Sequence, residues 1–162
     1  MAKTYRVTFV VRASNWIAGR LLRLGVNMGP MVLLTVRGRK SGQPRTTPVA
    51  MTEYEGKRYV VGTFGNVNWV RNLRAAGEAT LTRGRRAEQV SAVELPTAEA
   101  ARFLKQILPT APGFIRGYFD VTPDSPLEAF EREAPRHPVF LMQPIAQQAR
   151  DAARETVKSG SL

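Results

Sequence analysis

The residues best suited to chemistry in this chain are the cations of one short turn, residues 38–45, with the sequence GRKSGQPR. Counting Arg37 at its entrance, the turn holds four basic side chains, and two glycines accompany them. Guanidinium and ammonium groups donate charge-assisted hydrogen bonds to anions, and glycines allow backbone N–H groups to face outward. The turn therefore predicts an anion-binding site, and a solvated basic hairpin is the alternative that these residues leave open.

Two further segments carry residue types that suit a ligand pocket. Residues 62–65, with the sequence GTFG, end one predicted strand and lead into a helix, whose N-terminus favours anionic oxygen. Residues 68–73, NWVRNL, lie on that helix, where Trp69 and Leu73 share a face. Ordinary core packing is the alternative for Trp69, and capping of a neighbouring loop is the alternative for Asn72.

Short strands joined by tight turns must position these segments. Apolar and alternating runs bounded by Gly and Pro predict strands, whereas a period near 3.6 predicts helices. The expected strands cover residues 31–37, 45–54, 58–63, 79–82, 87–95 and 138–142. The expected helices cover residues 14–24, 67–76, 97–108 and 127–134. This mainly β pattern with short helices (α+β) predicts a small antiparallel barrel whose open sides are covered by helices.

The N-terminal helix, expected at about residues 14–24, carries an apolar stripe with Trp16 beside it. The stripe consists of Ile17, Leu21, Leu24 and Met28. Packing on the domain is the ordinary expectation for such a stripe. A lid over a ligand and a peripheral contact with a membrane are the alternatives.

Length and composition restrict the classes of function. The 162 residues indicate one domain at 1–146 and a C-terminal tail at 147–162. The chain has no cysteine and one histidine, His137, so we expect no metal site. Because no apolar run has the length of a membrane span and no signal peptide is evident, we expect a cytoplasmic protein, with membrane association as the open alternative.

The net charge of +11 favours an anionic partner. Basic residues are spread along the chain without zinc-finger spacing, an RNP-type strand or a clear helix-turn-helix, so we expect no nucleic-acid partner. An acidic small molecule or a membrane face remains as the partner that the charge predicts.

The turn 38–45, Pro48 just behind it and the helix segment 68–73 together resemble the deazaflavin-dependent nitroreductase and quinone reductase family of actinobacteria. The resemblance covers about residues 33–81 and extends weakly to the strand at 138–142. It implies a split antiparallel β-barrel of the FMN-binding-like type that binds coenzyme F420. This cofactor is a deazaflavin with a phospholactyl and oligoglutamate tail.

The same resemblance implies roles for individual residues. Lys40 and Arg45 match the family's cations for the phosphate and glutamate tail, while Arg37 and Arg39 add positive field. The other matched cofactor positions are Thr47, Pro48, Thr63, Phe64, Gly65, Trp69 and Asn72. The expected acceptor side holds Trp16, Phe114 and Tyr118. No catalytic residue is assigned; Tyr118 is a candidate proton donor, and solvent is the alternative.

The implied activity is hydride transfer from reduced F420 to a small-molecule electron acceptor: a quinone, an activated alkene such as an enone, or a nitro compound. An FMN-binding oxidoreductase on the same barrel is the second interpretation, because FMN also offers a ring and a phosphate to the turn. A non-catalytic carrier of cofactor or lipid, or an anion-binding protein, is the third. Barrels of this kind commonly pair through exposed sheet, so a homodimer is an open expectation.

Overall fold

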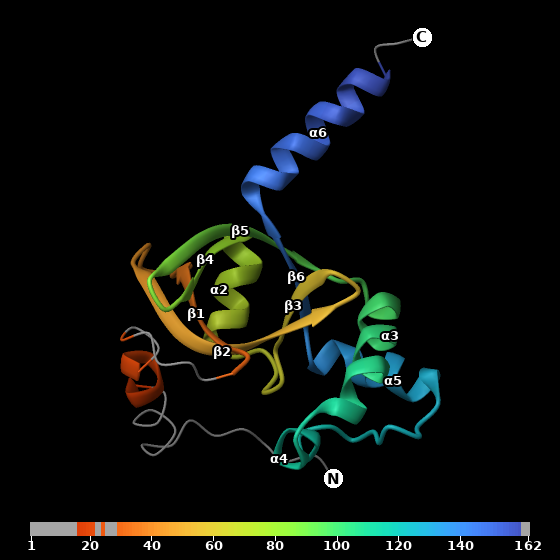
Figure 1. Cartoon of the computed structure of the whole chain (residues 1–162). Coiled ribbons are helices and arrows are strands. Elements are labelled where there is room, and N and C mark those ends of the chain that lie inside the picture. Colours follow the sequence, from red (N-terminus) through yellow and green to blue (C-terminus); the bar gives the residue numbers. More distant parts are fainter. Residues whose placement is uncertain (1–15, 22–23, 25–28, 160–162) are drawn as a thin grey trace.

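The computed structural model describes residues 16–21, 24 and 29–159. Within these residues, six antiparallel strands form a closed barrel in the order β1-β2-β3-β6-β5-β4 (Figure 1). They are β1 (Met31–Arg37), β2 (Pro44–Tyr54), β3 (Lys57–Val61), β4 (Glu78–Arg83), β5 (Arg86–Glu94) and β6 (Val139–Pro144). The predicted antiparallel barrel with short helices is confirmed, and each strand boundary lies within two residues of the predicted one.

The barrel interior is filled by side chains from alternate strand positions. Val32, Leu34 and Val36 of β1 are buried in this core. Helix α2 (Asn68–Ala76) lies over the barrel interior in Figure 1 and packs Val70 and Leu73 into the same core. Full burial of an aliphatic side chain of this size contributes about 1.5–3 kcal/mol, so these two residues fix α2 on the barrel.

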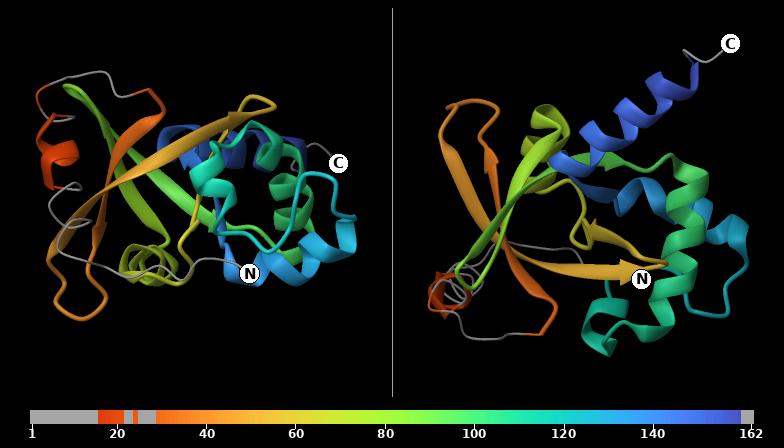
Figure 2. Two further views of the ribbon diagram at one scale, coloured as in Figure 1. Left: turned by 90° about the horizontal axis from the view of Figure 1, so that it is seen from below. Right: turned by 45° about the horizontal axis from the view of Figure 1, so that its top comes forward.

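A second apolar core lies beneath the helices of the segment 97–136. Its elements are α3 (Thr97–Ile107), η1 (Leu108–Thr110), α4 (Gly113–Arg116), α5 (Leu127–Glu133) and η2 (Ala134–Arg136). Phe103, Leu104 and Phe130 pack there with Tyr59 of β3. Figures 1 and 2 show these satellite helices gathered on the side of the barrel away from residues 16–21.

Helix α6 (Ile145–Ser159) follows β6 directly and projects from the barrel (Figures 1 and 2). The sequence predicts a separate tail from residue 147, whereas the structure continues the last strand into a regular helix. Residues 145–159 contain no Gly or Pro and are rich in Ala, Arg and Gln, which have high helix propensity.

Residues 16–21 are helical and form the central part of the helix expected at 14–24. The large apolar side chains of this segment, and that of Leu24 beyond it, are exposed: Trp16 to 62%, Ile17 to 51%, Leu21 to 36% and Leu24 to 80%. Met28, the last member of the predicted stripe, lies outside the described residues. The described members of the stripe are therefore exposed, although the helix lies close to β1 at Gly19, where an added Cβ would be 3.9 Å from Leu33 Cδ2; packing of the stripe on the domain stays a prediction.

Candidate functional site

The turn between β1 and β2 is closed by two backbone hydrogen bonds. The Gly38 N–H donates to the Gln43 carbonyl at 2.9 Å, and the Gly42 N–H donates to the Gly38 carbonyl at 2.9 Å. Gly42 has a φ of 70°, a conformation that favours glycine. A Cβ on Gly38 would lie 2.9 Å from Ser41 Oγ and 3.2 Å from the Gln43 carbonyl oxygen. The two glycines therefore allow a tight turn that presents its cations outward.

Asn72 anchors this turn to α2. Its side chain is nearly buried, and its Oδ1 accepts hydrogen bonds from the Arg39 backbone N–H at 3.2 Å and from Arg39 Nη1 at 2.8 Å. Because the guanidinium is charged, the shorter bond is stronger than a bond between neutral groups. Asn72 thus caps a neighbouring loop, which is the alternative that the sequence left open for it.

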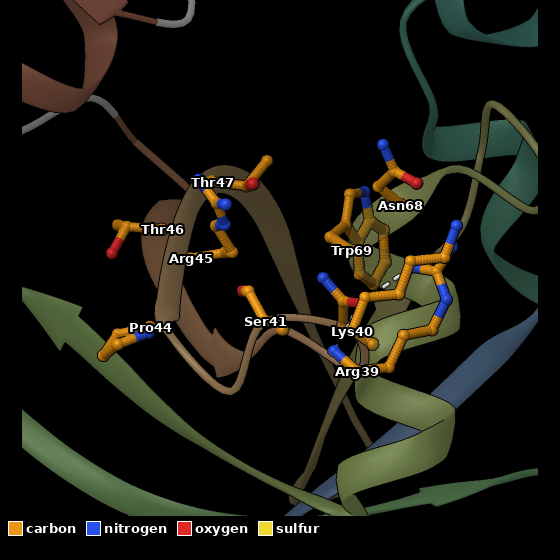
Figure 3. A pocket seen from close by; sticks show the side chains of 11 residues that line it. Arg39, Lys40, Ser41, Pro44, Arg45, Thr46, Thr47, Asn68 and Trp69 are labelled. Atoms are coloured by element: carbon orange, nitrogen blue, oxygen red, sulfur yellow. Dashed lines mark hydrogen bonds between the residues drawn. The ribbon is translucent and has the colours of Figure 1, made fainter.

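A cleft of about 720 Å³ lies between the turn, β2 and α2 (Figure 3). It is lined by Gly38, Arg39, Lys40, Ser41, Pro44, Arg45, Thr46, Thr47, Asn68, Trp69 and Asn72. Five predicted cofactor positions meet there: Lys40, Arg45, Thr47, Trp69 and Asn72. Pockets for small molecules and cofactors commonly have about 300–1,000 Å³, so the cleft has the size of a cofactor site.

The cations of the cleft lie on two sides of it. In Figure 3, Arg45 and Thr47 belong to the β2 side, whereas Arg39 and Lys40 lie toward Trp69 of α2. All three basic side chains are exposed, and none of them forms an ion pair with another described residue. Cations without carboxylate partners around one hollow produce a positive potential that attracts anions.

Trp69 serves both the core and the cleft. It is half-buried, packs against the barrel core and lies 6.4 Å from Phe140 between ring centroids. The same residue lines the cleft opposite β2, where it offers an apolar surface among polar groups. Both sequence interpretations of Trp69, core packing and ligand contact, are therefore compatible with its position.

The loop between β3 and α2 leads to the cleft without lining it. A Cβ on Gly62 would lie 3.0 Å from Val70 Cγ2, so the loop passes close to α2 at that point. The lining of the cleft includes Asn68 but not Thr63, Phe64 or Gly65. Cofactor contacts of these three loop residues stay predictions.

Pro48 also lies outside the lining of the cleft. It pairs with Leu33 in the ladder between β1 and β2, one residue beyond Thr47. Its predicted place beside the cofactor ring likewise stays a prediction.

An aromatic contact joins the β3–α2 loop to the expected acceptor side. The rings of Phe64 and Tyr118 meet edge-to-face, with centroids 4.8 Å apart and planes at 78°. Phe114 of α4 is 70% exposed. Trp16 contacts Arg20, whose Cζ lies 4.9 Å from the ring centroid. Because residues 16–21 lie away from α4 (Figure 2), the structure does not bring Trp16 to Phe114 and Tyr118.

Sequence reasoning missed several lining residues. It gave Arg39 only a contribution to the field, although Arg39 lines the cleft and bonds to Asn72. Ser41, Thr46 and Asn68 were not assigned. Each adjoins an assigned residue in the sequence, so their proximity to Lys40, Thr47 and Trp69 was the available signal.

The part of the chain that the structure describes contains neither a cluster of metal-binding side chains nor a membrane-spanning helix. In that part, no group of three His, Asp or Glu side chains lies close enough to hold a metal ion. None of the described helices has the length and apolar character needed to cross a membrane.

Several solved structures are similar to this chain, and two of those named here, with TM-scores of 0.50 or above, share its fold. One, described as the F420-H2 dependent reductase FDR-A, is 24% identical, with 70% of this chain and 94% of that chain covered and a TM-score of 0.48. Another, described as a domain-swapped dimer, is 24% identical, with coverages of 83% and 97% and a TM-score of 0.52. HutZ, a heme storage protein from Vibrio cholerae, is 11% identical, with coverages of 71% and 81% and a TM-score of 0.50. No curated protein shows a significant match.

Residues 5–122, most of the chain, match the family described as F420H(2)-dependent quinone reductase. The matched region contains the cationic turn, α2 and the loop that carries Phe64. This agrees with the resemblance that the turn and the helix segment 68–73 carry. The chain therefore belongs to the F420H2-dependent quinone reductase family, a family of oxidoreductases.

Proposed function

We propose that the chain binds coenzyme F420 in the cleft between the β1–β2 turn and α2, and that it uses this cofactor to reduce a small-molecule acceptor. The observation that carries the proposal is the group of three cations, Arg39, Lys40 and Arg45, which line the cleft without ion-pair partners among the described residues. The phosphate and glutamate tail of F420 are anions that such groups bind through charge-assisted hydrogen bonds.

In this proposal, different residues of the cleft bind different parts of the cofactor. Lys40 and Arg45 hold the phosphate and tail, while Thr47 and the apolar surface of Trp69 flank the ring system. When bound, the reduced deazaflavin supplies a hydride from C5 of its ring. The contribution of the chain is to bind and orient the cofactor and the acceptor, which lowers the entropic part of the barrier.

The acceptor class that we propose is a flat, electron-poor molecule. A quinone is the first choice, and an enone or a nitro compound is the alternative within the same class. Phe64, Tyr118 and the exposed Phe114 offer aromatic surface for such a molecule. Tyr118 is also the candidate proton donor, with solvent as the alternative.

FMN is the second candidate cofactor, because its single phosphate also suits Lys40 and Arg45. The test is a titration of the purified protein with F420 and, separately, with FMN, following the fluorescence of each cofactor. We expect F420 to bind more tightly and reduced F420 to support quinone reduction. Tighter binding of FMN would contradict the proposal and favour the flavin.

The exposed side chains near the N-terminus support a peripheral role for that helix. Trp16, Ile17 and Leu24 are exposed, and Arg20 lies among them. We propose that this surface contacts a membrane face that holds an apolar acceptor. Sedimentation with neutral and anionic vesicles tests this contact: we expect the protein to sediment with the anionic vesicles, and its absence from both pellets would contradict the proposal.

A homodimer is the assembly that we propose. One structure of the same fold is described as a domain-swapped dimer. In this chain, α6 projects as an arm whose residues 149–157 are all exposed. Light scattering of the full chain should give the mass of two copies, and the mass of one copy would contradict the proposal.

A further inference from the structure

A buried histidine–carboxylate pair lies at the junction of the satellite helices and the barrel. His137 and Glu133 are each 4% exposed, and His137 Nε2 lies 2.9 Å from Glu133 Oε1. On the other side of the ring, His137 Nδ1 lies 2.9 Å from the Thr63 carbonyl oxygen. A carbonyl oxygen only accepts, so Nδ1 donates to Thr63, and a second proton lies between Nε2 and the Glu133 carboxyl group.

The imidazole ring is fixed by further contacts. It stacks on Phe119, with centroids 4.0 Å apart and planes at 25°. Burial lowers the pKa of His137, and the hydrogen bond to Glu133 opposes this shift. Arg136 Nη1 lies 3.2 Å from Glu133 Oε2 and 2.8 Å from Asp120 Oδ2, so both carboxyl groups near the ring have a cation beside them.

The pair connects two segments of the candidate site that are far apart in the sequence. Glu133 Oε1 accepts a hydrogen bond from the Asp120 backbone N–H at 3.0 Å, which fixes the segment 118–121. His137 holds the loop 62–65 through the carbonyl of Thr63. The two segments meet where the rings of Phe64 and Tyr118 touch.

We propose that Glu133 and His137 are positioning residues, which hold the loop 62–65 against the segment 118–121 and so fix Phe64 against Tyr118. The proposal rests on the proposed function where it assigns these two rings to the acceptor side. Buried pairs of this kind are expensive to desolvate and often contribute little net stability. The location of the pair between two site segments therefore favours positioning over packing as its role.

The test compares His137→Phe with two other variants. His137→Phe keeps an aromatic ring over Phe119 and removes both hydrogen bonds. His137→Asn keeps a donor near the position of Nδ1 and serves as the conservative rescue. Phe130→Leu is the matched control, because Phe130 is fully buried in the second apolar core and belongs neither to the loop 62–65 nor to the segment 118–121.

The first measurement is hydrogen–deuterium exchange of the amides in residues 62–67, without cofactor. The Gly65 and Val67 N–H groups are hydrogen-bonded within this loop. We expect His137→Phe to speed their exchange at least tenfold relative to Phe130→Leu, and His137→Asn to restore part of the protection. Exchange no faster than in Phe130→Leu would overturn the proposal. If His137→Phe does not fold, His137→Leu, which also removes both hydrogen bonds of the ring, gives the same comparison.

The second measurement separates the acceptor from the cofactor. With a quinone as acceptor, we expect His137→Phe to lower kcat/KM about tenfold and to change the F420 Kd less than twofold. If the F420 Kd rose by the same factor by which kcat/KM fell, the assignment of the pair to the acceptor side would be overturned. Because the exchange measurement uses the protein alone, it stands or fails independently of the identity of the cofactor.

Discussion

Replacing Asn72 by Asp separates the anchoring of the cationic turn from its charge. The new carboxylate keeps the oxygen that accepts from the Arg39 N–H and from Arg39 Nη1, and turns the 2.8 Å bond into an ion pair. The cost of desolvating a carboxylate at the buried position 72 offsets most of the attraction to the exposed Arg39, so the net change is about 0–1 kcal/mol. We therefore expect the turn to keep its shape and the protein to keep its thermal midpoint within a few degrees.

The same substitution places a negative charge on the wall of the cleft. An anion held about 6 Å from the new carboxylate, at an effective dielectric constant of about 20–40, is repelled by roughly 1.5–3 kcal/mol. The charge of Arg39 is also neutralised. The Kd for F420 should therefore rise roughly tenfold to a hundredfold, measured by fluorescence titration beside a melting curve.

Asn72→Ala is the matched control, because it removes the acceptor of both bonds without adding charge. We expect it to lower the free energy of unfolding by about 1–3 kcal/mol and to weaken cofactor binding as the turn loosens. If Asn72→Asp lost thermal stability while its affinity for F420 stayed unchanged, the cleft would not be the site of the anionic tail.

Three further sets of variants test separate parts of the molecule. Lys40→Ala and Arg45→Ala should each weaken F420 binding by about 1–3 kcal/mol, whereas the controls Arg83→Ala and Arg86→Ala, at the β4–β5 hairpin, should change it little. If a titration shows equal effects for all four variants, the cations form a diffuse basic surface and not a specific site. Gly38→Ala should cost about 1–3 kcal/mol in the free energy of unfolding, measured in urea, because its Cβ would meet Ser41 and the Gln43 carbonyl; an unchanged midpoint would show that the turn relaxes. Deleting residues 1–28 should abolish binding to anionic vesicles and spare cofactor affinity, with a cooperative melting curve; loss of that transition would show that the segment belongs to the core.

The strands were predictable because their signals are local. Apolar runs such as residues 31–36, and the Gly and Pro residues that bound them, specify strand and turn without knowledge of the partner strand. The cations Lys40 and Arg45 were also visible, since they lie together in one such turn. Barrel formation then brings the turn and α2 to the two sides of one cleft.

The contacts that complete the site depend on the tertiary structure. Arg39 and Asn72 are 33 residues apart, and Thr63 and His137 are 74 residues apart, so no local pattern joins either pair. The exposed apolar side chains of Trp16 and Leu24 are a second feature that the sequence alone could not explain. Their spacing predicts one apolar face, while the surface that such a face covers depends on the rest of the molecule and its partners.

The anionic tail is the part of F420 that the cleft should recognise, and its contribution can be measured directly. Affinities are determined for a tail-less deazaflavin and for F420 with increasing numbers of glutamates, each at low and at high salt. Because Lys40, Arg45 and Arg39 are exposed cations, affinity should rise with each added glutamate and fall as salt screens the charges. Equal affinity for the tail-less and the full-length cofactor at both salt concentrations would contradict an anion-binding role of the turn.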